Sequence, residues 1–138
     1  DAEVTPADIA AWERRHGRLP DGACVAMRSG WDRHVGGPRL RTVGADGRTT
    51  HFPGFNLGAG RFLLEQRRVV GIAVVRPSLD VGASRDVAGH DAWLPTGRRG
   101  PESAANPGDL PAAGATIVVG SPKPAGATGG PSRVFALV

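Results

Sequence analysis

One histidine and one glutamate stand twelve positions apart at the ends of the segment HDAWLPTGRRGPE, as His90 and Glu102. Imidazole nitrogen and carboxylate oxygen are ligands that suit Zn²⁺ or Mn²⁺. Two ligands are too few for a structural or catalytic zinc site. On residue type and spacing alone, the pair is more typical of solvated or structurally hydrogen-bonded side chains. The pair therefore indicates at most a part of a metal site.

Two aspartates, Asp80 and Asp86, precede this histidine in a segment without regular periodicity. A carboxylate that accepts the second ring N–H of a ligating histidine fixes the tautomer and the orientation of the ring. An aspartate in a loop can equally accept hydrogen bonds from its own neighbouring backbone. Both interpretations stay open for Asp80, and the turn role is favoured for Asp86.

The elements that must position these residues follow from capping and from hydrophobic pattern. Thr5 and Pro6 are typical of a helix start, and Gly17 is well placed to end that helix. A second helix is predicted over 57–67. The order of elements predicts a mixed α/β fold. Short and almost wholly apolar runs predict buried strands over 23–28, 69–75, 115–119 and 134–138, with loops over 29–51 and 77–91.

Length and composition limit the class of protein. The chain has 138 residues, 40% of them hydrophobic, which is enough for one domain with a real core. The net charge of +4 comes mostly from scattered arginines, and only 5% of residues are aromatic, so we expect no nucleic-acid partner. No apolar run approaches the roughly 20 residues of a membrane span. Because Cys24 is the single cysteine, no internal disulfide can form, and cysteine usage does not determine the cellular compartment. We interpret Cys24 as a core residue.

Several segments together resemble the cyclase family of metal-dependent hydrolases, which includes kynurenine formamidases and isatin hydrolases. The segments are HFPGF, SLD, HDAWLPTGRRGPE and GATGGPSR. Their order and spacing, rather than any one of them, carry the resemblance, which covers nearly the whole chain. It implies a swivelling β/β/α-type fold, in which a mixed sheet is flanked by helices, incomplete in this chain. Family members are commonly homo-oligomers.

The resemblance also implies roles for individual residues. His90 and Glu102 would bind a divalent metal, Zn or Mn, and Asp80 would support the histidine. Four further residues would lie near the substrate pocket, although ordinary packing roles remain open for them. They are Trp31, in the family's GW motif, and His51, Phe52 and Phe55 of HFPGF.

The principal metal motif of the family, HxGTHxDxPxH, has no copy in this chain. We therefore expect residues 1–138 to form a single domain, the C-terminal portion of a cyclase-type hydrolase domain. The remaining ligands and the general base would come from a missing N-terminal segment or from a second chain. We expect this chain alone to be inactive.

The reaction that the resemblance implies is hydrolysis of an amide or lactam C–N bond. Arylformamides such as N-formylkynurenine, an intermediate of tryptophan catabolism, are the best-known substrates of the family. The alternative is a non-catalytic binding or scaffold domain derived from the same fold. Two departures favour this alternative: Val75 stands where the family commonly has Asp, and residues 87–89 replace its F-P-V.

Overall fold

In the computed structural model, the first helix, α1 (Pro6–His16), begins at a capping box. Thr5 Oγ1 accepts the backbone N–H of Asp8 at 3.3 Å, and Asp8 Oδ2 accepts the backbone N–H of Thr5 at 2.9 Å. These reciprocal bonds satisfy backbone donors that the helix leaves free. The helix ends at Gly17, whose φ of 87° is a conformation that a residue without Cβ adopts readily. The predicted helix and both of its ends are confirmed.

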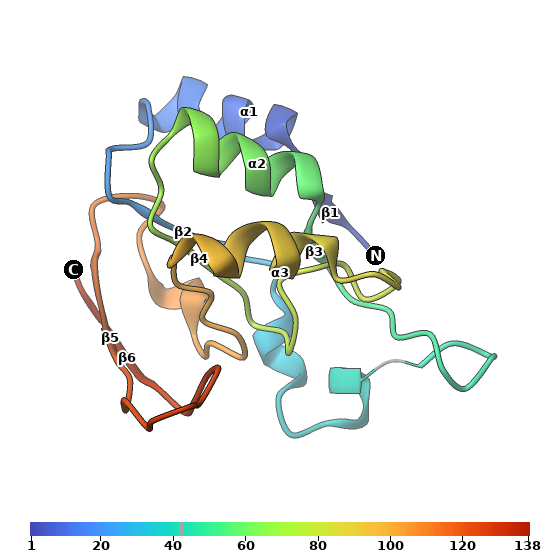
Figure 1. Cartoon of the computed structure of the whole chain (residues 1–138). Helices are drawn as coiled ribbons and strands as arrows, with labels where there is room; N and C mark the ends of the chain where they lie inside the picture. Colours follow the sequence, from blue (N-terminus) through green and yellow to red (C-terminus); the bar gives the residue numbers. More distant parts are fainter. Residues whose placement is uncertain (42) are drawn as a thin grey trace. The chain divides into compact units, whose positions relative to one another are not determined.

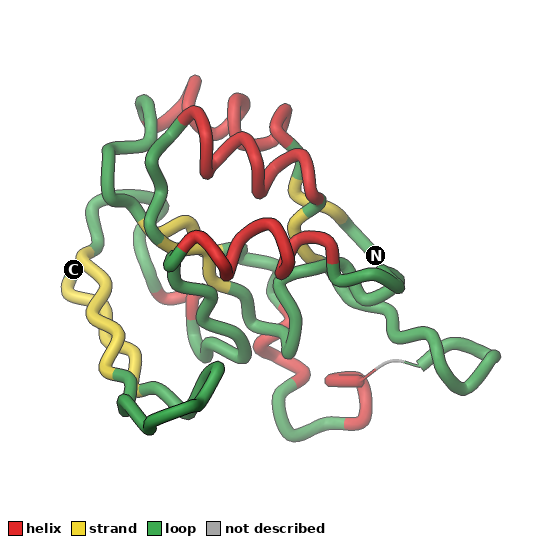
Figure 2. Tube along the Cα trace, in the orientation of Figure 1, coloured by secondary structure: helices red, strands yellow, loops and turns green. Residues whose placement is uncertain are grey.

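The structure describes residues 1–41 and 43–138, and the chain divides into two units, Asp1–Gly108 and Asp109–Val138. Figure 2 shows that loops connect short helices and strands throughout. The first unit contains β1 (Glu3–Val4), α1, β2 (Cys24–Ala26), β3 (Gly54–Phe55), α2 (Leu57–Gln66), β4 (Gly71–Ala73) and α3 (Ala88–Trp93). Its 3₁₀ helices are η1 (Trp31–His34), η2 (Pro38–Arg41) and η3 (Leu94–Thr96), and η4 (Pro107–Asp109) follows at the boundary. The second unit contains β5 (Thr116–Gly120) and β6 (Arg133–Leu137).

Strand β4 lies at the centre of the first unit. It pairs in parallel with β2, so that Val25 stands opposite Ile72. On its other side runs the extended segment 99–104: the N–H of Ile72 donates to the carbonyl of Arg99 at 3.1 Å, and the N–H of Val74 donates to the carbonyl of Pro101 at 3.0 Å. A second parallel pair joins β1 to β3. The prediction of a mixed α/β fold is confirmed.

Helix α2 packs between α1 and α3 (Figure 1). The apolar side chains of these helices and of β3 and β4 form one buried cluster, and removal of this surface from water is the main source of its stability. The buried members are Ile9, Leu19, Phe55, Ala59, Leu63, Val69, Ile72, Val74, Leu79 and Trp93. All three residues of β4 are buried, as its uninterrupted apolar run predicts, although the strand is shorter than the predicted range 69–75.

The second unit is an antiparallel pair, β5 with β6, in which Val118 stands opposite Phe135. The strands predicted over 115–119 and 134–138 are thus confirmed, but their predicted burial is wrong. Val118 is 47% exposed, Phe135 57% and Leu137 63%. Apolar character expresses a preference for burial, whereas two paired strands leave both of their faces open.

The segment 77–91, predicted to be irregular, contains the start of α3 at Ala88. The long loop predicted over 29–51 contains η1 and η2. Helices α3, η1 and η2 span too few turns for hydrophobic periodicity to reveal them. No helix of the described residues is long and apolar enough to cross a membrane.

Candidate metal centre

Helix α3 begins on the carboxylate of Asp80. The backbone N–H of Gly89 donates to Oδ1 at 2.7 Å, and that of His90 donates to Oδ2 at 3.2 Å. The residue before the helix, Val87, has a left-handed backbone with φ of 42° and offers no side-chain cap. Asp80 therefore takes the role of the N-cap from seven positions further back in the chain. A Cβ at Gly89 would overlap Oδ1 of Asp80, so this close approach requires glycine.

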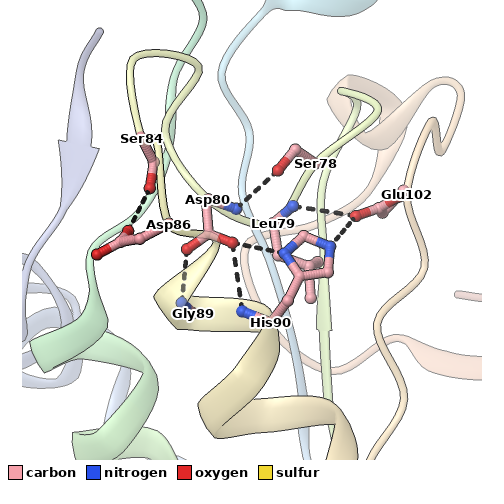
Figure 3. A network of polar contacts seen from close by, with 8 residues as sticks. All are labelled: Ser78, Leu79, Asp80, Ser84, Asp86, Gly89, His90 and Glu102. Atoms are coloured by element: carbon pink, nitrogen blue, oxygen red, sulfur yellow. Dashed lines mark hydrogen bonds and ion pairs between the residues drawn. The ribbon is translucent and has the colours of Figure 1, made fainter.

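The imidazole of His90 lies between two carboxylates (Figure 3). Its Nδ1 is 2.5 Å from Oδ2 of Asp80, and its Nε2 is 2.8 Å from Oε1 of Glu102. The same oxygen of Glu102 accepts the backbone N–H of Leu79 at 3.1 Å. Pairing of 99–104 with β4 carries Glu102 to this position. The side chains are 7%, 24% and 32% exposed for Asp80, His90 and Glu102, so the site opens to solvent on the glutamate side.

Two opposing effects act on the protonation of His90. Burial alone would lower the pKa of the imidazole, but the hydrogen bonds and negative charges of Asp80 and Glu102 outweigh it, so the pKa lies above its ordinary value. With both ring nitrogens facing carboxylate oxygens, the imidazolium form donates on both sides. A cation near Glu102 could take the place of the Nε2 proton, because metal binding to histidine requires the neutral ring.

The donor set fits part of a metal site. Adjacent ligands of an ion with bonds of about 2.1 Å lie roughly 3.0–3.4 Å apart, and Nε2 of His90 is 2.8 Å from Oε1 of Glu102. A small outward shift of the glutamate would suffice. Asp80 holds the other ring nitrogen, as carboxylates behind ligating histidines commonly do. Among the described residues, no group of three or more His, Cys, Asp or Glu side chains could hold an ion. At this place the described residues therefore offer at most two donors to an ion, Nε2 of His90 and Oε1 of Glu102.

The residues predicted to lie near a substrate pocket separate into three places. Trp31 and Phe52 both face Arg76: their ring centres are 5.0 and 4.4 Å from its guanidinium carbon. Phe55 belongs to the apolar core. His51 lies outside this core, and its Nδ1 is 2.5 Å from Oδ2 of Asp1.

None of these four residues lines the polar hollow of about 580 Å³ in the first unit. That hollow is formed by two loops, and the side chains in it are small or charged. Its lining residues are Asp46, Arg48, Thr49, Thr50, Gly82, Ala83, Ser84 and Arg85.

No site role was predicted for Arg76 from the sequence, yet this residue is almost completely buried, with 1% of its surface exposed. An arginine directly after the apolar run GIAVV was the available signal, because an arginine is rarely buried without a partner. Cys24, predicted to be a core residue, is only partly buried and lies outside the buried apolar cluster. Burial nevertheless raises the pKa of its thiol to about 11, which does not suit a nucleophile.

The chain is similar to isatin hydrolases in sequence and in fold. An isatin hydrolase of Roseibium aggregatum is 32% identical over 142 residues; the match covers 100% of this chain and 53% of the relative. The solved structure of isatin hydrolase A from Labrenzia aggregata, bound to benzyl benzoate, is 36% identical with a TM-score of 0.91, over 99% of this chain and 54% of that one.

A second solved structure is equally similar in fold. It is an isatin hydrolase bound to the product analogue thioisatinate, 30% identical with a TM-score of 0.90, over 100% of this chain and 53% of that one. The chain thus spans about half the length of each of these relatives. The model of the Cyclase family matches residues 1–81, which is more than half of the chain, and the chain therefore belongs to the Cyclase family.

Proposed function

We propose that the complete protein is a metal-dependent hydrolase that cleaves the C–N bond of an amide or lactam. The observation that supports this most is the arrangement of His90 between Asp80 and Glu102, which offers one nitrogen and one oxygen to a shared cation. Membership in the Cyclase family and the likeness to isatin hydrolases support the class of reaction.

In this proposal each side chain has a separate task. Asp80 accepts the Nδ1 proton of His90, which leaves the lone pair of Nε2 for the cation. The backbone N–H of Leu79 keeps Oε1 of Glu102 on the same side. A bound Zn²⁺ or Mn²⁺ would supply a water of lowered pKa and polarise the substrate carbonyl. In the overall reaction, the water oxygen bonds to the carbonyl carbon, the C–N bond breaks and the nitrogen gains a proton.

Two ligands do not complete a hydrolytic metal site. Because the chain spans about half the length of its relatives, we infer that the remaining ligands and the general base lie in the part of the protein outside residues 1–138. A second polypeptide is the other possible source. The liganded relatives favour an aryl lactam of the isatin type as substrate, and an arylformamide such as N-formylkynurenine is the second candidate.

The test is metal content and turnover of the full-length protein, with isatin and N-formylkynurenine assayed side by side. His90→Ala and Glu102→Gln should each lower bound Zn or Mn and turnover by at least about tenfold, as expected for lost ligands. His16→Ala, at the exposed end of α1, is the matched control and should leave both unchanged. Full metal content and turnover in His90→Ala would contradict the proposal.

The 138-residue chain is the second test. With Zn²⁺ or Mn²⁺ added, we expect it to hydrolyse neither substrate, because its described residues offer only two ligands at the site. Turnover by this chain that is lost in His90→Ala would show that the metal shell is complete within it.

A further inference from the structure

Arg76 carries a buried guanidinium group to which none of the described residues offers a polar partner. The residue is 1% exposed, and its Nε, Nη1 and Nη2 atoms have no hydrogen-bond partner among the described residues. Nε1 of Trp31 is in the same condition, and the Trp31 ring centre is 5.0 Å from the guanidinium carbon. Two neighbouring side chains thus present only donors, and within the described part of the chain no acceptor meets them.

An arginine cannot escape this condition by losing its proton, since its guanidinium stays charged in proteins. Burial lowers the pKa of Arg76, yet the ion pairs of the described residues do not include it. A buried charge without a counterion and without hydrogen bonds is strongly unfavourable. The unpaired donors therefore indicate an anionic acceptor.

The surroundings of Arg76 define the shape of that acceptor. Phe52 and Trp31 cover the guanidinium, with their ring centres 4.4 and 5.0 Å from its central carbon, and favourable cation–π contacts offset part of the burial. Contacts of this kind leave the N–H groups unsatisfied. The planar fork of an arginine forms two parallel hydrogen bonds to the oxygens of a carboxylate, as it also does to those of a phosphate.

Arg76 is also tied to the segment that carries the proposed metal ligand. Its carbonyl accepts the backbone N–H of Ser103 at 2.9 Å, and Ser103 follows Glu102 directly. Since hydrolysis of an amide or lactam C–N bond releases a carboxylic acid, a donor pair beside this segment suits the product.

We propose that Arg76 and the indole N–H of Trp31 form a binding site for a carboxylate group. This rests on the proposed function where the carboxylate is that of the reaction product. The same chemistry could come from an Asp or Glu side chain in the part of the protein outside residues 1–138. In either case neighbouring side chains must move to admit the carboxylate, because the guanidinium nitrogens and Nε1 of Trp31 are enclosed.

The experiment follows the indole N–H resonances of the full-length protein, labelled with ¹⁵N-tryptophan, during titration with benzoate and with benzamide in chloride-free buffer. Trp31→Phe assigns the resonance of Trp31. Trp93, whose Nε1 donates to the carbonyl of Arg99 at 3.0 Å, is the internal control. Binding is read without turnover, so a protein that hydrolyses neither proposed substrate would still report on this site.

We expect benzoate, but not benzamide, to move the Trp31 resonance. Arg76→Gln should weaken benzoate binding about tenfold or more, the usual range for a lost hydrogen bond to a charged group. Arg61→Gln, at an exposed position of α2, should have no effect. Arg76→Lys keeps the charge without the fork and should bind benzoate weakly, which provides a second variant should Arg76→Gln fail to fold.

The remaining outcomes distinguish a carboxylate that belongs to the protein from a failure of the proposal. A Trp31 resonance that does not respond to benzoate, in a protein that Arg76→Gln destabilises toward urea, would assign the site to a carboxylate of the protein itself, because that carboxylate would be left buried without a partner. A Trp31 resonance that does not respond to benzoate, in a protein that Arg76→Gln leaves equally or more stable toward urea, would overturn the proposal, because no carboxylate would then pair with Arg76. Benzoate binding of equal strength in wild type and Arg76→Gln would also overturn it, since the metal alone would then hold the acid.

Discussion

Oδ2 of Asp80 lies 2.5 Å from Nδ1 of His90, and the same carboxylate accepts the N–H groups that open the helix carrying this histidine. One side chain therefore determines both where α3 begins and how the imidazole is turned. Orientation of the ring and position of the helix cannot vary independently. This coupling explains how a short helix after a left-handed residue, Val87, can hold the imidazole of His90 in place.

Substitution Asp80→Asn should affect metal binding and folding together. The neutral amide is a weaker acceptor for the ring N–H, and supporting carboxylates of this kind typically contribute about 10–100-fold to metal affinity. Loss of the charged acceptor at the start of α3 should also lower the free energy of unfolding by about 1–2 kcal/mol. Metal titration and urea denaturation of the full-length protein measure the two effects.

Asp86→Asn is the matched control for this substitution. Asp86 accepts the hydroxyl of Ser84, at 3.1 Å, on an exposed loop. Its replacement should change the free energy of unfolding by less than about 0.5 kcal/mol and leave metal affinity unchanged. Equal effects of the two substitutions would show that Asp80 has no special role in holding His90.

The position of Gly89 provides a steric test of the same arrangement. Because an added Cβ would overlap Oδ1 of Asp80, Gly89→Ala should push the carboxylate away and destabilise the protein by about 1–3 kcal/mol. Gly60→Ala is its counterpart: a Cβ there meets nothing within 4 Å inside α2, and alanine should stabilise the helix by about 0.5–1 kcal/mol. Thermal unfolding of both variants gives the comparison, and a stable Gly89→Ala protein would argue against the close approach.

The sequence placed His90 and Glu102 together through their resemblance to a family pattern, and the structure brings them within 2.8 Å. Their spacing alone could not do so, since their proximity depends on the pairing of 99–104 with β4. The partner of Arg76 could not be predicted either. The burial of this charge depends on the aromatic side chains that pack over it. These side chains, Trp31 and Phe52, come from two segments that are distant in the sequence.

The ion pair of Glu13 with Arg67 should contribute to stability at neutral pH. Nε of Arg67 is 2.7 Å from Oε1 of Glu13, both side chains are less than 15% exposed, and Oε1 also accepts the N–H of Leu19. Glu13→Gln should lower the free energy of unfolding by about 1–3 kcal/mol, since the buried cation loses its partner. Asp21→Asn, in the exposed pair with Arg68, should cost less than about 0.5 kcal/mol in denaturant unfolding.

The pH dependence of this pair has a definite sign. The hydrogen bond from Arg67 is the main cause that lowers the pKa of Glu13 in the folded protein below its ordinary value of 4.5. The stabilisation is therefore complete above that value and is lost as the pH falls through the lowered pKa. Wild-type protein should lose stability over this acid range more steeply than Glu13→Gln. Parallel pH profiles for the two proteins would contradict the assignment.

How well the fold could be predicted differs between its parts. The capped helix α1 and the buried strand β4 follow from local signals, a Thr-Pro start and an uninterrupted apolar run. The burial predicted for the strands of the second unit was wrong. Apolar residues on both faces of a hairpin do not indicate which surface, if any, covers those faces. Ile117 and Val118, neighbours on opposite faces of β5, are 36% and 47% exposed.

This exposure leads to a prediction for the second unit by itself. A peptide of residues 109–138 contains only the two paired strands β5 and β6, and an isolated two-stranded hairpin is at best marginally stable in water. With Phe135 and Leu137 exposed, the peptide should show a disordered circular dichroism spectrum at low concentration and associate as its concentration rises. Cross-strand nuclear Overhauser contacts between Val118 and Phe135 in a monomeric peptide would show instead that the hairpin holds its register without a covering surface.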